Sequence, residues 1–170
     1  MFGPHISGDS LDVFDDLVMA GSNRNKEVVQ LFSLNKRQLI ANVDWESGRK
    51  DLETGFVFGA RFTKPNPNMI IAGGAGKNEV KIFENNCDGS ASYRVLASLN
   101  DLDAPCFSLD VTRNGESFAF GCQDGRIFVC STKLEEGVEF EGYQGGSVEH
   151  LAQSKVHPGG FPEEDEERKD

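Results

Sequence analysis

The stretch "SLDVTRNGESFAFGCQDGRIFVCST", Ser108 to Thr132, decides the fold of this chain. Its first apolar run alternates with polar residues, its second is nearly continuous, and its third alternates again. Alternation with a period of two is typical of a half-buried strand, and a short continuous apolar run fits a strand buried on both faces. The stretch therefore predicts three consecutive strands, separated by the turns "RNGES" and "QDG".

The same pattern occurs twice earlier, in residues 10–34 and 59–85, and corresponding apolar positions such as Leu11, Ala60 and Leu109 lie 49 positions apart. A fourth alternating run follows in "QLIANVDW" and in "YRVLASL", whereas "VEFEGYQ", Val138 to Gln144, is the weak candidate in the third unit. A period near 50 with four strands per unit is typical of a β-propeller. We therefore expect an all-β chain with about three four-stranded antiparallel blades.

The expected blades cover about residues 5–46, 55–100 and 104–146, so that residues 1–146 form a partial propeller. Three blades are too few to close a propeller, and they leave two open blade faces. We expect further blades from another copy of this chain, from a different protein or from residues missing from a truncated gene model. The alternative is an open three-blade segment that packs on a docking surface of a large assembly. With a second copy or another protein, the chain is part of a homo- or hetero-oligomer.

The segment "GCQDGRIFVCS", Gly121 to Ser131, resembles the WD-repeat family, in which a glycine and an Asp-Gly turn precede an alternating strand and a Trp-Asp pair. Here Cys130-Ser131 occupies the Trp-Asp position, and Lys26 and Lys77 stand where the other two units would carry the turn aspartate, Asp124. The resemblance covers about residues 5–145, and no unit has the literal Trp-Asp pair. It implies a non-catalytic scaffold for protein interactions.

An alternative within the same resemblance is a substrate- or cargo-recognition subunit of a cytoplasmic complex, of the ubiquitin-ligase or trafficking type. That role predicts a basic or aromatic pocket on one face. The acidic sequence shows no obvious pocket of this kind. The segments "GPHISGDSLDVFDD" and "AGGAGKNEVKIFENN" also resemble segments of WD-repeat proteins of ciliated and flagellated eukaryotes. This second resemblance implies a cytoskeletal role, in the cytoplasm and in the axoneme of a cilium or flagellum.

The glycines of "AGGAGKNEVKIFENN", Ala72 to Asn86, could at first be a phosphate-binding loop. A P-loop requires a glycine where Ile71 stands and a Ser or Thr where Asn78 stands. It must also lead into a helix, whereas "EVKIF" alternates like a strand. We expect a hairpin in which Gly73 ends the second strand and Gly74 and Gly76 belong to the turn, with no nucleotide or other cofactor.

The remaining candidate residues indicate neither an enzyme nor a metal site. No Cys, Asp or Glu stands at metal-ligand spacing from the three histidines, and the four cysteines contain no C-x-x-C pair, which favours reduced thiols. Asp124 and Gly125 are interpreted as a structural turn. Trp45 ends a fourth strand, and both a partner contact and packing against the next blade are open for it. The three histidines are His5, His150 and His157.

The net charge is −11, which argues against nucleic acid and against an anionic membrane as partners. Residues 147–170 read as a polar and acidic tail, expected to be largely disordered, and "PEEDEERKD" ends it. No apolar stretch approaches the length of a bilayer-spanning helix, and the N-terminal residues are not typical of a signal peptide. We therefore expect a soluble, cytoplasmic protein.

Overall fold

The structure is a computed structural model that describes residues 2–24, 26–45, 55–86 and 91–132. The described residues form three antiparallel sheets of consecutive strands, which we call blades 1, 2 and 3. Blade 1 contains β1 (Leu11–Phe14), β2 (Leu17–Gly21), β3 (Val29–Ser33) and β4 (Gln38–Asn42). Blade 2 contains β5 (Gly55–Phe62), β6 (Met69–Gly76), β7 (Val80–Asn85) and β8 (Tyr93–Leu99). Blade 3 contains β9 (Cys106–Val111), β10 (Ser117–Cys122) and β11 (Ile127–Ser131).

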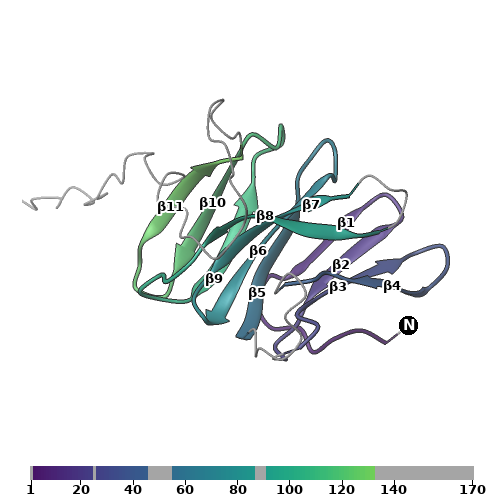
Figure 1. Cartoon of the computed structure of the whole chain (residues 1–170), viewed down its shortest axis with the longest axis horizontal. Coiled ribbons are helices and arrows are strands. Elements are labelled where there is room, and N and C mark those ends of the chain that lie inside the picture. The colour runs from purple at the N-terminus through teal and green to yellow at the C-terminus, as the bar shows by residue number, and fades with distance from the viewer. Residues whose placement is uncertain (1, 25, 46–54, 87–90, 133–170) are drawn as a thin grey trace, which may run out of the picture.

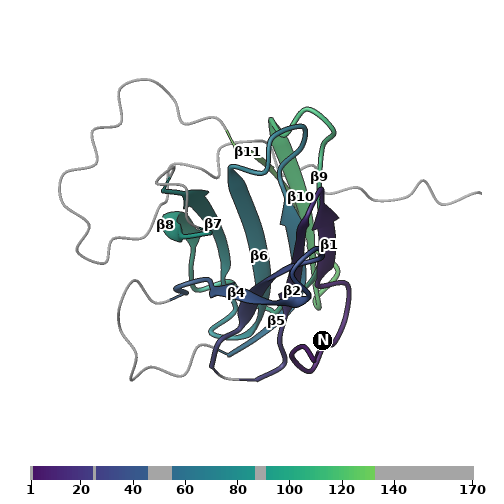
Figure 2. The same ribbon diagram turned by 90° about the vertical axis from the view of Figure 1, so that its right-hand side faces the viewer.

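The all-β prediction is confirmed, with sheets of four, four and three strands. The strand suggested at Val138 to Gln144 and the acidic tail lie outside the described residues. Figure 1 shows the three sheets side by side, with blade 2 between the other two, and Figure 2 looks along this row from the side of blade 1. The first strands of the blades are adjacent, because β5 contacts both β1 and β9.

Two hydrophobic cores fill the two junctions between blades, and blade 2 contributes to both. Ile70 and Ala72 of β6 belong to the core shared with blade 1, whereas Ile71, between them, belongs to the core shared with blade 3. Successive side chains of a strand point to opposite faces, so a strand covered on both sides must be apolar throughout. This explains why "MIIAG" is a continuous apolar run.

The first strands of blades 2 and 3 carry a bulge at the same place in the repeat. Register shifts fall between Val57 and Gly59 in β5, and between the pairs of Cys106 and Ser108 in β9. The extra residues are therefore Phe58 and Phe107, and their rings meet edge to face with centroids 5.4 Å apart. A bulge re-aims a side chain, and here it brings two aromatic rings together at the junction.

Arg61 of β5 forms ion pairs with residues of both neighbouring blades. Its guanidinium is paired with the carboxylate of Asp9, and its Nε lies 3.4 Å from Oδ1 of Asp110. A parallel bridge between Asp9 and Gly59 extends the same junction. Arg61 and Asp110 occupy corresponding positions of the repeat, 49 residues apart, whereas Asp9 lies two residues before β1. These ion pairs tie the blades together where they are closest.

The glycines of "AGGAGK" occupy positions that differ from the prediction, in which the strand ended at Gly73 and the turn began at Gly74. Gly73 and Gly74 lie inside β6, which continues to Gly76, so the turn starts at Lys77. A Cβ on Gly74 would lie 1.7 Å from the carbonyl oxygen of Phe56. Glycine is required at this position because β5 approaches too closely, not because the chain turns. Gly76 does have the positive φ of 100° that was expected of a turn glycine.

Candidate functional site

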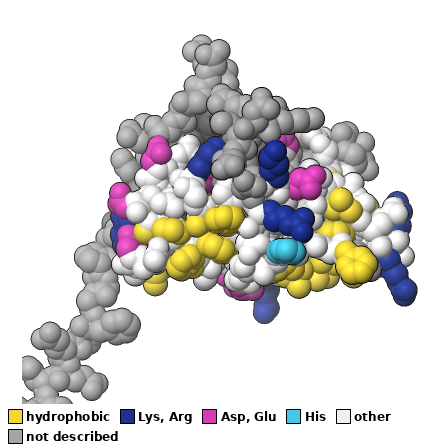
Figure 3. All heavy atoms as spheres, turned by 90° about the horizontal axis from the view of Figure 1, so that it is seen from below, with side chains coloured by type: hydrophobic (Ala, Val, Ile, Leu, Met, Phe, Trp, Pro, Cys, Tyr) yellow, Lys and Arg dark blue, Asp and Glu magenta, His cyan; other side chains and the backbone are white. Residues whose placement is uncertain are grey.

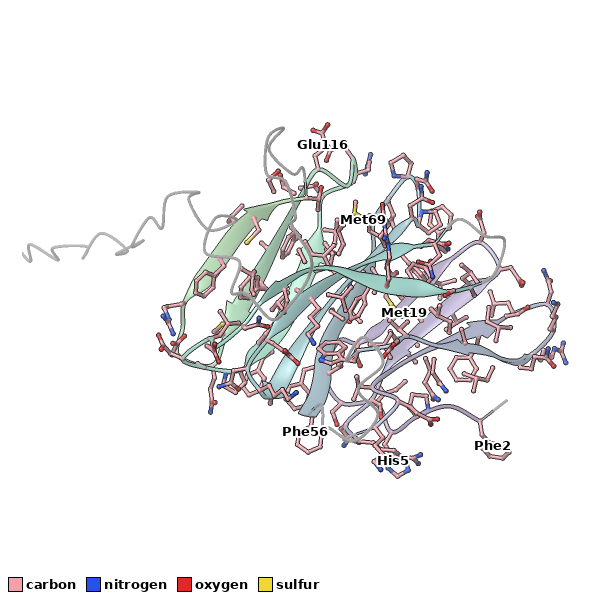
Figure 4. All side chains as sticks on the ribbon, viewed as in Figure 1. Phe2, His5, Met19, Phe56, Met69 and Glu116 are labelled. Carbon is pink, nitrogen blue, oxygen red and sulfur yellow. The ribbon has the colours of Figure 1, made fainter. Side chains whose placement is uncertain are left out.

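A pocket of about 650 Å³ opens between blades 1 and 2, at the end of the strands where the β2–β3 and β6–β7 turns lie. We call this the pocket end. Figure 4 labels Phe56 and His5 at this end, opposite Glu116, which lies in the β9–β10 turn. The pocket is lined by residues from both turns and from the start of β5: Asn23, Arg24, Lys26, Glu27, Gly55, Phe56, Gly76 and Lys77.

Three of the lining residues are cationic and one is anionic, in a protein whose net charge is −11. Arg24 and Lys26 are exposed, and within the described part of the chain their side-chain cations form no ion pair. The carboxylate of Glu27 accepts a hydrogen bond from Asn42 at 3.2 Å. Figure 3 looks at the pocket end and shows Lys and Arg side chains beside hydrophobic ones.

Hydrogen bonds hold the first residues of the β2–β3 turn to blade 2 on one side and to the N-terminal segment on the other. Ser22 is buried, its oxygen Oγ accepts the N–H of Arg24 at 3.1 Å, and its carbonyl accepts the N–H of Val57 at 2.9 Å. The N–H of Asn23 donates to the carbonyl of His5 at 2.8 Å. These bonds fix the base of the turn against blade 2, so the position of Arg24 relative to the pocket is set by the fold.

A pair of glycines forms part of the pocket wall. Gly55 and Gly76 are register partners with φ of 92° and 100°. A Cβ on Gly55 would lie 2.1 Å from the carbonyl oxygen of Ala75, and one on Gly76 would lie 2.7 Å from the Cα of Gly55. Only glycine fits here, because side chains at either position would collide with the facing backbone. Beside this pair, Phe56 is 41% exposed and gives the pocket an apolar surface.

Trp45 lies in the core, with 5% of its surface exposed, so a partner contact, one of the two alternatives left open for it, does not describe its position in this structure. The alternative, packing against the next blade, describes its position: its ring lies 5.4 Å from that of Phe83 in β7. Its Nε1–H donates to Oε1 of Glu79 at 2.5 Å, and its carbonyl accepts a hydrogen bond from Nζ of Lys81 at 2.9 Å. Nζ of Lys81 also lies 3.4 Å from Oε2 of Glu79. Sequence reasoning missed this buried charge pair, although the alternation of "EVKIF" gives Glu79, directly before β7, and Lys81 the same side of the chain.

Asp124 and Gly125 lie in the β10–β11 turn, where the sequence placed them. The carboxylate of Asp124 accepts hydrogen bonds from the N–H and from Nε of Arg126, at 3.2 and 2.7 Å. These bonds lower the pKa of Asp124 and raise that of Arg126, which also pairs with Asp103 at 2.8 Å. Gly125 adopts a φ of 84°. These local hydrogen bonds and the positive φ of Gly125 are those of a structural turn.

Three described cysteines are buried and free. Burial, with a smaller effect of Cys122, raises the pKa of the Cys106 thiol to about 12, and burial raises that of Cys130 to about 11. Thiols with such values are protonated at neutral pH and react slowly. Among the described residues no group of three or more His, Cys, Asp or Glu could hold a metal ion, and no helix could span a membrane. His150 and His157 lie outside the described residues.

The outer faces of blades 1 and 3 carry exposed apolar side chains. On blade 3, Ile127 and Val129 of β11 are 71% and 58% exposed, on the face opposite to the one that packs against blade 2. On blade 1, Leu11 and Val13 of β1 are about half exposed, and Leu39 of β4 lies in the cross-strand row of Val13. We call these the two end faces.

No family model and no curated protein matches the sequence. The structure is similar to a solved β-propeller domain, that of Cps50 (Swd1) from Myceliophteria thermophila, with a TM-score of 0.59 and 11% sequence identity. The match covers 78% of this chain and 38% of the solved chain. The described blades therefore have the arrangement of part of a β-propeller, and this chain spans well under half of the propeller domain that it matches.

Proposed function

We propose that this chain is a non-catalytic scaffold, a WD-repeat-like segment whose blades are completed by those of another protein chain within a larger assembly. The observation that supports this most directly is the pair of end faces. In a closed propeller every blade face is covered by a neighbour, and exposed apolar side chains on a sheet favour contact with a further sheet. The partner is either a second copy, which would bring the number of blades to six, or a different protein.

Light scattering on the purified full chain tests this proposal. We expect the chain to associate, and we expect Ile127→Lys combined with Val129→Lys to weaken the association, because the two ammonium groups would be buried without partners. Leu34→Lys, at an exposed apolar residue in the β3–β4 turn, is the matched control and should leave association unchanged. A well-folded monodisperse monomer that gains no partner in co-purification from its source cell would contradict the proposal.

The compartment is a separate part of the proposal. We place the chain in the cytoplasm and in the axoneme of a cilium or flagellum, on the basis of its resemblance to WD-repeat proteins of ciliated eukaryotes. Tagged localisation and proximity labelling in the source cell test this. Enrichment along the axoneme with labelled cytoskeletal neighbours is the expected result, and labelling confined to a ubiquitin-ligase or trafficking complex would replace it.

A substrate- or cargo-recognition role is the second candidate, and the pocket favours it. Such a role needs a concave site with apolar surface and a few polar groups that fix orientation. The pocket combines the ring of Phe56 with cations from Arg24, Lys26 and Lys77. Neither function excludes the other, because the end faces and the pocket lie on different parts of the molecule.

A further inference from the structure

We propose that the pocket between blades 1 and 2 binds an acidic peptide that carries an apolar side chain next to its carboxylates. This inference deepens the recognition role proposed above and rests on it. The end faces play no part in it, so peptide binding and association through the end faces can succeed or fail separately.

The charge of the pocket supports an anionic ligand. Arg24 and Lys26 belong to blade 1 and Lys77 belongs to blade 2, so the cations approach the pocket from two sides. In the described part of the chain the side chains of Arg24 and Lys26 form no ion pair, and the same is true of Lys36, Arg37 and Arg113, which lie in turns at the opposite end of the strands. The cations of Arg24 and Lys26, at a concave site of an acidic protein, attract carboxylates at short range.

The shape and the lining of the pocket support a peptide. Its volume of about 650 Å³ suits a few side chains of an extended segment. The exposed ring of Phe56 offers an apolar contact at the same place. The net charge of −11 opposes a long polyanion such as RNA, whose many phosphates would also meet the acidic remainder of the surface.

We assign the peptide to a partner protein. The C-terminal stretch "PEEDEERKD" of this chain, Pro162 to Asp170, is also acidic, but it has no apolar side chain apart from Pro162. It therefore lacks the group that would lie against Phe56 while carboxylates pair with Arg24 and Lys26.

Fluorescence anisotropy with the full chain tests the inference. The probe is a short fluorescein-labelled peptide of alternating Glu and Leu, compared with peptides of alternating Glu and Ser and of alternating Lys and Leu. We expect binding of the Glu-Leu peptide that weakens as salt is added, weaker binding of Glu-Ser, and none of Lys-Leu. Arg24→Glu combined with Lys26→Glu should weaken binding about tenfold.

The matched control reverses two cations at the opposite end of the strands, with the same change in net charge. Lys36 lies in the β3–β4 turn and Arg113 in the β9–β10 turn, and both are exposed. Lys36→Glu combined with Arg113→Glu should change binding less than about twofold. An equal loss in both double variants would overturn the proposal, since the peptide would then respond only to total charge. Displacement of the peptide by single-stranded RNA at a lower concentration than by unlabelled peptide would also overturn it.

A third variant tests the assignment to a partner protein. In it, the Glu and Asp residues between Pro162 and Asp170 are replaced by Gln and Asn in the full chain. We expect unchanged binding of the probe. Tighter binding would show that this acidic stretch competes for the pocket, and it would overturn the assignment to a partner protein.

Discussion

At the scale of single residues, the buried pair of Glu79 and Lys81 gives the sharpest prediction. Their side chains are 9% and 7% exposed, and both hold Trp45 in the junction between blades 1 and 2. Lys81→Met should lower the free energy of unfolding by about 3–5 kcal/mol, because the carboxylate of Glu79 would stay buried without its cation. Urea denaturation measures this. Lys81→Met combined with Glu79→Met should cost less than the single change, and a double variant that is less stable than Lys81→Met would contradict the pairing.

Gly74 gives a second prediction at this scale, with a control from the same kind of strand. A Cβ at Gly74 would lie 1.7 Å from the carbonyl oxygen of Phe56, whereas a Cβ at Gly121 of β10 would meet nothing within 4 Å. We expect Gly74→Ala to destabilise the protein by about 2 kcal/mol or more, because β5 must move, and Gly121→Ala to change stability by no more than about 0.5 kcal/mol. Thermal unfolding compares the two. If the two substitutions lowered stability equally, β5 and β6 would be able to move apart with little loss of free energy.

At the scale of an element, the β10–β11 hairpin makes a prediction about pH. Hydrogen bonds from Arg126 hold the pKa of Asp124 below its ordinary value of 3.8. A carboxyl group whose pKa is lowered by folding stabilises the folded state above its unfolded pKa, and that stabilisation is lost as the pH falls through the lowered value. Asp124→Asn should therefore have a lower melting temperature than the unchanged chain at neutral pH. The difference should shrink below about pH 3.8, and a difference that persists once Asp124 is protonated would contradict this account.

The strands themselves were predictable from the sequence, because the pattern of apolar residues in each strand reflects whether one or both of its faces are covered. Alternation in "RIFVC" marks β11, which is covered on one face, and the continuous run "MIIAG" marks β6, which is covered on both. The turn at Asp124-Gly125 was predictable because its hydrogen bonds are local. These features depend on neighbours in the chain, and the sequence contains those neighbours directly.

The features that were not predicted depend on contacts between distant segments. Gly74 resembles a turn glycine until β5 lies beside it. For Trp45 the sequence left two alternatives open, and only the contacts with Glu79 and Phe83 decide between them. The pocket is of the same kind, because Arg24 and Phe56 belong to different blades. A repeat pattern gives the elements of a blade, while the junction between two blades depends on residues that differ from one repeat to the next.

At the scale of the whole molecule, the order of the blades predicts a gradient of local stability. Blade 2 contributes to both hydrophobic cores, and blades 1 and 3 contribute to one core each. In a linear array each unit is stabilised by its neighbours, so the middle unit has two stabilising interfaces and the end units have one. Local opening should therefore start at the end faces.

Native-state hydrogen exchange measures this gradient. We expect the amides of Ile71 and Phe83 in the middle blade to exchange only through global unfolding, and those of Met19 and Phe120 in the outer blades to exchange faster, through partial opening. A bound partner that covers the end faces should slow exchange in blades 1 and 3 and leave blade 2 almost unchanged, because blade 2 is already covered on both sides. If Met19 or Phe120 were protected as strongly as Ile71 in the isolated chain, the three blades would unfold as one unit. The end faces would then be stable without a partner, and the main argument for a completed propeller would fail.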